Sequence, residues 1–198
     1  MGCSELVQIR GDDMPGIVGN FEDCPVIICD NNNCIAEAII KEHDRINSTI
    51  EISKTLSDYE HGYRLSVLIL HPGGTVEFSG TLRKLQGSGR EIALFNERHR
   101  GARGAPRHKL NSPATIRSLV LENGRQPFAP PLKVVIHDIS KTGVLIKSPP
   151  GHFDIGSVLE LHFNIHGKDA ILYATVVRKC DGDDDATIGF GCKLLFLS

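Results

Sequence analysis

The sequence lacks the features that mark several large classes of protein. Its longest apolar runs are about the length of Pro25–Cys29 and Val67–Leu70. A membrane-spanning helix needs ~18 apolar residues, so none is expected. No secretion signal or other targeting segment is visible, and none of the six cysteines belongs to a CxxC pair. A zinc site and a disulfide framework are therefore not expected, and free thiols in a reducing cytoplasm are favoured.

The chain also lacks the common signatures of catalysis and of metal binding. It has no GxSxG nucleophile elbow and no GxxxxGK[ST] phosphate-binding loop. His162 and His166 fall on one predicted strand, where their spacing separates them by ~13 Å, too far to share one ion. The acidic run Asp181–Asp185 lacks the Gly and Glu positions of a calcium loop. We predict no metal, no cofactor and no enzymatic activity.

The sequence has no large excess of charge of either sign, and its basic residues are concentrated in one short segment. The formal net charge of −2 argues against binding to bulk nucleic acid or to a membrane surface, which requires a strongly basic field. Residues 98–109 nevertheless contain no Asp or Glu and concentrate the basic residues Arg98, Arg100, Arg103, Arg107 and Lys109. This basic segment is the one place in the sequence where clear attraction for an anion is expected.

What the sequence does contain is a series of short β-like segments separated by polar and Gly-rich turns. Alternating apolar residues predict strands from residue 46 onward, and residues 34–40 fit either a strand or one or two helical turns. A second series has six predicted strands: Ala114–Glu122, Leu132–Asp138, Gly143–Lys147, Val158–Ile165, Ala170–Arg178 and Ile188–Phe196. Helix signals are nearly absent. We predict an all-β protein with two small antiparallel β-barrels in tandem, the second six-stranded.

The breaks between these series divide the chain into four predicted segments. Residues 1–30 mix Gly, Asp, Pro and Asn, which predicts a poorly ordered N-terminal arm. Residues 31–96 are predicted to form the N-terminal barrel domain. Residues 97–113, with their glycines, prolines and arginines, are predicted to be a linker between domains. Residues 114–198 are predicted to form the C-terminal barrel.

Two short motifs carry groups that can bind a ligand. Only Gly-Ala-Pro separates Arg103 from Arg107, and arginine can grip a phosphate or the O6/N7 edge of guanine bidentately. Further along, Asp138-Ile-Ser-Lys-Thr-Gly143 connects two predicted strands. Its carboxylate can accept guanine N1–H and N2–H, Ser140 can donate to a ligand oxygen, and Gly143 permits close approach to the backbone. A solvated linker and an ordinary Asx-turn are the alternatives without a ligand.

In this order, RxxxR and then [D/N]xSxxG, the two motifs resemble the signature of the PilZ domain, the bacterial receptor module for cyclic di-GMP. The resemblance covers about residues 97–198. Ala174–Arg178 resembles the family's penultimate strand and Ile188–Phe196 its closing strand. Residues 46–96 more faintly resemble the N-terminal barrel of flagellar-brake-type proteins.

The resemblance implies a cytoplasmic bacterial receptor for cyclic di-GMP that acts on a protein partner in motility, pili, biofilm or virulence. It implies ligand contacts from Arg103, Arg107, Asp138, Ser140 and Gly143. Additional candidate contacts are Arg98, Arg100 and Arg178. The ligand would order the arginine-rich linker and reorient the two domains. The arginine doublet that often begins the PilZ motif is here Arg98-His-Arg100, and the number of nucleotides bound stays open.

Two alternatives also stay open. The first is a PilZ-like module that binds a protein but no nucleotide. The second is a DNA-binding regulator that responds to cyclic di-GMP. The net charge of −2 and the lack of a recognition helix count against the second alternative.

Overall fold

The computed structural model describes residues 20–54, 56–72, 74–84, 90–95, 106–180 and 187–195. All regular structure in these ranges is β-strand, so the predicted all-β class is confirmed. Residues 34–40 lie within a strand, which decides between the two conformations that the sequence allowed. No helix in these ranges is long and apolar enough to cross a membrane.

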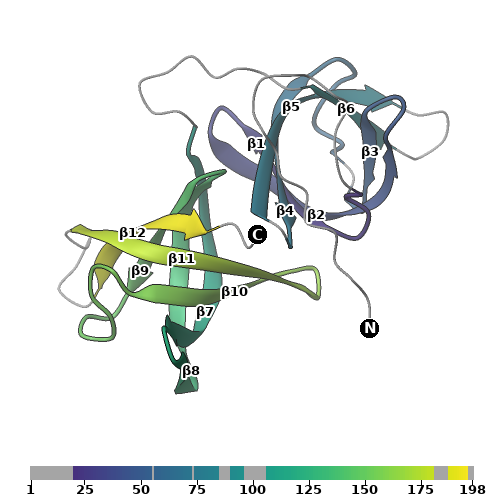
Figure 1. The fold of residues 1–198 in the computed structure, drawn as a ribbon. Helices are drawn as coiled ribbons and strands as arrows, with labels where there is room; N and C mark the ends of the chain where they lie inside the picture. The colour runs from purple at the N-terminus through teal and green to yellow at the C-terminus, as the bar shows by residue number, and fades with distance from the viewer. Residues whose placement is uncertain are drawn as a thin grey trace, which may run out of the picture.

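The first six strands close into an N-terminal barrel, coloured purple to teal in Figure 1. These strands are β1 (Pro25–Asp30), β2 (Asn33–Asp44), β3 (Thr49–Ile52), β4 (Arg64–His71), β5 (Gly74–Lys84) and β6 (Arg90–Phe95). Their order in the sheet is β1-β4-β5-β6-β3-β2, and antiparallel pairing between β1 and β2 closes the ring. Closure leaves no free sheet edge in this barrel.

The last six strands close into a C-terminal barrel, green to yellow in Figure 1. They are β7 (His108–Leu121), β8 (Gly124–Ser140), β9 (Gly143–Ser148), β10 (Val158–Ile165), β11 (Lys168–Cys180) and β12 (Ile188–Leu195). Their order is β7-β10-β11-β12-β9-β8, closed by antiparallel pairing of β7 with β8. All six strands of the predicted second series are present. β7 and β8 extend further than predicted and meet in a tight hairpin at residues 121–124.

The predicted N-terminal arm, residues 1–30, is wrong for residues 25–30, which form β1. Val26 and Ile28 belong to the core of the N-terminal barrel, whereas Ile27 and Cys29 pack toward the C-terminal barrel. All four side chains are fully buried. A strand buried on both faces shows no alternation of apolar and polar residues, so its apolar run did not reveal a strand.

The predicted linker, residues 97–113, is wrong for residues 108–113, because β7 already begins at His108. The pairing of β7 with β8 is interrupted between Lys109 and Ser112, where Asn111 has a φ of 53°. A bulge of this kind breaks the two-residue period of a strand, which hides the strand in the sequence.

The two barrels also share an apolar contact. One cluster of buried residues lies within the N-terminal barrel. The other fills the C-terminal barrel and includes four residues of β1 and β4 from the N-terminal barrel: Ile27, Cys29, Leu68 and Leu70. Nearby, Asn33 and Lys109 form a parallel bridge, and the Lys109 N–H donates to the Asn32 carbonyl at 2.7 Å. The barrels therefore touch through buried apolar surface and through backbone hydrogen bonding.

Candidate functional site

The structure describes five of the eight residues predicted to contact a ligand. The predicted contacts outside the described residues are Arg98, Arg100 and Arg103. The predicted contacts within them are Arg107, Asp138, Ser140, Gly143 and Arg178. All five belong to the C-terminal barrel or to the residues that lead directly into it.

Arg107 and Asp138 bring the two motifs together in space. Arg107 precedes β7, and Asp138 lies near the end of β8, where it pairs with Lys109. The Arg107 Nη1 atom is 3.5 Å from Asp138 Oδ1, and the two side chains are 43% and 16% exposed. A half-exposed ion pair of this length contributes only ~0–1 kcal/mol. The guanidinium can therefore turn toward an anionic ligand at little cost.

Ser140 and Gly143 close the turn between β8 and β9. The Ser140 hydroxyl donates to the Gly143 carbonyl at 3.2 Å and accepts the Thr142 N–H at 3.4 Å. Ser140 is buried, so its hydroxyl serves the turn in this conformation. A Cβ atom on Gly143 would lie 2.8 Å from the carbonyl oxygen of Cys192 on β12. Packing against β12 thus requires glycine here even without a ligand.

A row of paired residues connects Asp138 with Arg178 across four neighbouring strands. Asp138 on β8 pairs with Leu145 on β9, Leu145 pairs with Gly191 on β12, and Gly191 pairs with Arg178 on β11. Val144 and Ile146 point into the barrel core, so Leu145 and its row face outward. At ~4.8 Å between strands, the row spans about 14 Å from Asp138 to Arg178.

Gly191 leaves a gap in the side chains of this outer face, and Arg178 lies over it. A Cβ atom on Gly191 would lie 2.7 Å from Arg178 Nε. The Arg178 side chain is exposed and flexible, so it can move aside or turn its guanidinium to a ligand. The outer face of β8, β9, β12 and β11 therefore has a carboxylate at one side, a guanidinium at the other, and Leu145 and Gly191 between them.

Sequence reasoning missed two contacts that reach this site from the N-terminal barrel. Glu77 Oε1 is 2.7 Å from Nε2 of His108, the residue that follows Arg107. The Thr75 hydroxyl donates to the carbonyl of Lys141, inside the turn after β8, at 2.6 Å. The alternation along β5 marked both side chains as outward-facing, but only the placement of the second barrel shows what covers them.

The histidines form no metal site in the residues that the structure describes. No group of three or more His, Cys, Asp or Glu residues there could hold a metal ion. The His162 Nε2 atom is 2.9 Å from Glu160 Oε1, whereas His166 Nε2 is 2.8 Å from the backbone carbonyl of Glu37. The two imidazoles thus have separate partners.

Comparison with known proteins relates part of the chain to one protein family. The family model of the PilZ domain matches residues 101–198. No curated protein matches the chain.

Among solved structures, the Bacillus subtilis inhibitor of motility MotI/DgrA is 14% identical, with 91% of this chain and 90% of that chain covered and a TM-score of 0.38. Escherichia coli YcgR in complex with c-di-GMP is 11% identical, with 89% and 77% covered and a TM-score of 0.35. The K. pneumonia MrkH–c-di-GMP complex is 17% identical, with 88% and 80% covered and a TM-score of 0.34. The family match, the two ordered motifs and the six-stranded barrel identify residues 101–198 of this chain as a PilZ domain.

Proposed function

We propose that this protein is a bacterial receptor for cyclic di-GMP that controls a protein partner in the cytoplasm. The observation that carries the proposal is the Arg107–Asp138 pair, in which the two halves of the PilZ signature meet. They meet at one end of the outward-facing row that ends at Arg178. The role is that of a receptor and not of an enzyme.

In this proposal the nucleotide lies across the outer face of the C-terminal barrel. Arg103 and Arg107 fold over it and bind its phosphates and guanine edges, since arginine suits both. Asp138, Ser140 and Gly143 form the side of the site nearest the turn, and Arg178 binds at the far side. Each hydrogen bond to a charged group contributes ~1.5–3 kcal/mol, so a micromolar or lower Kd is expected. Arg98 and Arg100 are the candidates for binding a second nucleotide.

The response we propose is a change in the relative placement of two domains. The domains are the N-terminal barrel, with the flagellar-brake-like pattern, and the PilZ barrel, joined by the arginine-rich linker. Because β6 ends at Phe95 and β7 begins at His108, ordering the linker around the nucleotide would act directly on the start of β7. Leu68 and Leu70 already bury apolar surface between the barrels, so reorientation has to be a shift across this contact.

Titration of the full chain with cyclic di-GMP in a calorimeter tests the proposal. The wild-type protein should bind, and Arg103→Ala and Arg107→Ala should each abolish measurable binding without lowering the melting temperature. Arg117→Ala is the matched control, because Arg117 is 55% exposed on the same barrel and pairs with Asp169 at 3.7 Å. No heat with the wild-type protein would instead favour a protein-interaction module that binds no nucleotide.

A further inference from the structure

Strand β5 of the N-terminal barrel presents two buried polar side chains to the PilZ domain. Phe78 and Val76 pack in the core of the N-terminal barrel. Because successive residues of a strand point to opposite faces, Thr75 and Glu77 point away from that core. On the outside of a barrel they would normally meet water, yet the whole residues, backbone included, are only 6% and 9% exposed. The C-terminal barrel covers them.

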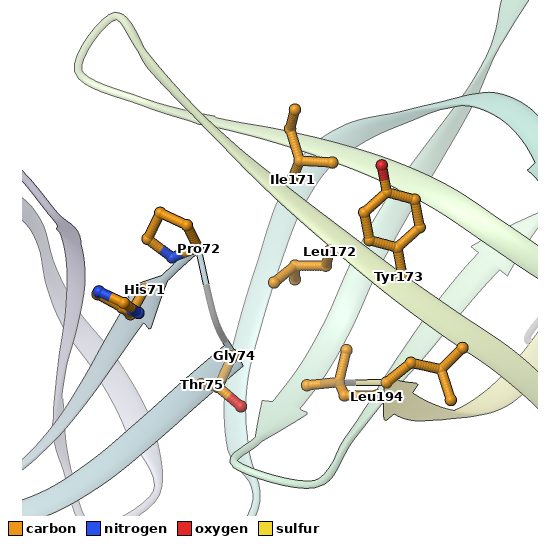
Figure 2. A pocket seen from close by; sticks show the side chains of 9 residues that line it. His71, Pro72, Gly74, Thr75, Ile171, Leu172, Tyr173 and Leu194 are labelled. Carbon is orange, nitrogen blue, oxygen red and sulfur yellow. The ribbon is translucent and has the colours of Figure 1, made fainter. Parts of the chain in front are cut away.

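Thr75 contacts the turn half of the PilZ signature. Its hydroxyl donates at 2.6 Å to the carbonyl of Lys141, which lies between Ser140 and Gly143 in the chain. Figure 2 shows Thr75 at the start of β5, close to Leu172 and Leu194 of the C-terminal barrel. The cavity that these residues line measures only ≈ 10 Å³, about the room for one water molecule. The hydrogen bond is therefore formed where the two barrels are closely packed.

Glu77 contacts the arginine half of the signature. Its carboxylate is 2.7 Å from His108, and each of the two side chains is 1% exposed. His108 follows Arg107 in the chain and begins β7, where it pairs with Ile139 of β8. Holding the His108 ring thus fixes the point at which the chain leaves the arginine loop and enters the barrel.

The chemistry of the Glu77–His108 pair suits positioning better than stabilisation. Within the part of the chain that the structure describes, Glu77 Oε2 and His108 Nδ1 have no hydrogen-bond partner. A buried ionisable pair that is only partly satisfied adds little or nothing to stability compared with apolar side chains in its place. What such a pair does provide is one preferred relative placement of the two elements that carry it.

We propose that Thr75 and Glu77 are positioning residues of the nucleotide site, which is therefore completed by the N-terminal barrel. Two residues apart on one strand, they hold the turn half and the arginine half of the signature at a fixed separation. The effect of these two residues on ligand binding rests on the proposed function. Their positioning of the two halves of the signature is a property of the protein without ligand. Because coupling between sites is reciprocal, a partner that moves β5 changes nucleotide affinity by the same factor by which nucleotide changes partner affinity.

The experiment compares matched variants of the full chain by two measurements. Thr75→Val removes the hydroxyl and keeps the shape, Thr75→Ser keeps the hydroxyl, and Glu77→Gln removes the charge. Thr81→Val is the control. Thr81 lies on the same face of β5, but its strand-pairing partners are Arg64 on β4 and Ala93 on β6, both in the N-terminal barrel. Hydrogen exchange of residues 138–143 and 107–109 is measured without ligand, and the Kd for cyclic di-GMP by calorimetry.

Thr75→Val should speed exchange in the turn, and Glu77→Gln in residues 107–109, with the rest of the chain unchanged. Each should also raise the Kd by about 5- to 100-fold, within the usual range of coupling between sites. Thr75→Ser and Thr81→Val should match the wild-type protein in both measurements.

The outcomes separate this inference from the proposed function. If the wild-type protein binds and Thr75→Val changes neither exchange nor Kd, the positioning role is wrong and the receptor function stands. If the wild-type protein binds no nucleotide but Thr75→Val still speeds exchange in the turn alone, the receptor function falls and the positioning role stands. Faster exchange throughout the chain would show a merely structural role for Thr75 and overturn the inference.

Discussion

The two barrels share one strand order and differ in what their equivalent turns hold. In each, six consecutive strands follow the order first, fourth, fifth, sixth, third, second, and the first pairs with the second. In each, an amide of the sixth strand donates to the turn between the second and third strands. These hydrogen bonds are Leu94 to Ser48 at 2.8 Å and Leu194 to Thr142 at 3.0 Å. The same topology therefore places an equivalent turn at the same end of each barrel.

The carboxylates at these two turns have different surroundings. Asp44, at the end of β2, accepts the backbone N–H groups of Ile46 at 2.8 Å and Asn47 at 3.1 Å, and the Asn47 side chain at 2.6 Å. The hydrogen bonds from Asn47 hold the pKa of Asp44 below its ordinary value. In the described chain, Asp138 instead contacts the half-exposed Arg107. Asp44 is thus used by its own turn, whereas Asp138 is available to a ligand.

On the proposed function, the barrel topology alone does not make a nucleotide site. Shared topology supplies the turn, and the side chains placed on that turn decide whether it binds. Variants that act on one barrel and not on its counterpart test this conclusion.

The largest effect should come from the buried residues of β1. Ile28 packs inside the N-terminal barrel and Ile27 against the C-terminal barrel, and both are fully buried. Ile28→Ala and Ile27→Ala should each lower the free energy of unfolding by ~2–5 kcal/mol, through lost packing and the cavity left behind. Urea denaturation followed by circular dichroism measures this. Ile27→Ala should also make the two barrels unfold in separate transitions, because Ile27 packs between them. Two separate transitions already in the wild-type protein would contradict the apolar contact between the barrels.

A smaller effect, confined to one barrel, is expected for the two turn carboxylates. Asp138→Ala should raise the Kd for cyclic di-GMP by about 10- to 100-fold, because a hydrogen bond to a charged group is lost. Asp44→Ala should leave the Kd unchanged, since its carboxylate serves its own turn. Calorimetric titration of both variants decides the matter. Equal effects of the two substitutions would remove the distinction between the barrels.

The next prediction compares two glycines of the PilZ domain. Gly143→Ala should lower the free energy of unfolding by ~1–3 kcal/mol, because the new Cβ meets the rigid backbone of Cys192. Gly191→Ala should cost less than about 0.5 kcal/mol, since the atoms it meets belong to the flexible Arg178 side chain. Gly191→Ala should instead weaken nucleotide binding by displacing that guanidinium. Chemical denaturation and titration of both variants separate packing from ligand contact.

The smallest effect should appear in acid, at Glu160 of the C-terminal barrel. Burial raises the pKa of Glu160, but hydrogen bonds from Ser118 and His162 and the charge of Arg125 outweigh it and hold the pKa below its ordinary value. Because the folded pKa is lowered, this stabilisation is present above the pKa of the unfolded chain. It is lost as the pH falls through the folded value.

Thermal melting between pH 7 and pH 3 tests this dependence. Glu160→Gln should flatten the loss of stability toward low pH. An unchanged pH profile for Glu160→Gln would show that this network contributes nothing to acid sensitivity.

Strands in which apolar and polar residues alternate could be predicted from the sequence. Strands that are buried on both faces or interrupted by a bulge could not. Val158–Ile165 and its neighbours were predicted close to their observed bounds because their apolar residues recur at every second position. β1 was missed because both its faces are buried, and the start of β7 because Asn111 breaks the pattern. Each failure arises where packing between the barrels or a bulge overrides the local period.

The candidate site shows the same division. The two motifs could be located from the sequence through their resemblance to a family signature, and Arg107 and Asp138 do lie together. The roles of Ser140 and Gly143 within the turn, and the contacts of Thr75 and Glu77, depend on neighbours far away in the chain. A one-dimensional pattern indicates which side chains face outward from a barrel, but not whether another barrel covers them.

The most direct test of the account is a calorimetric titration of the full chain with cyclic di-GMP, run side by side for the wild-type protein, Arg107→Ala and Arg117→Ala. Micromolar or tighter binding is expected for the wild-type protein and Arg117→Ala, and no measurable binding for Arg107→Ala. Normal binding by Arg107→Ala, or none by the wild-type protein, would contradict it.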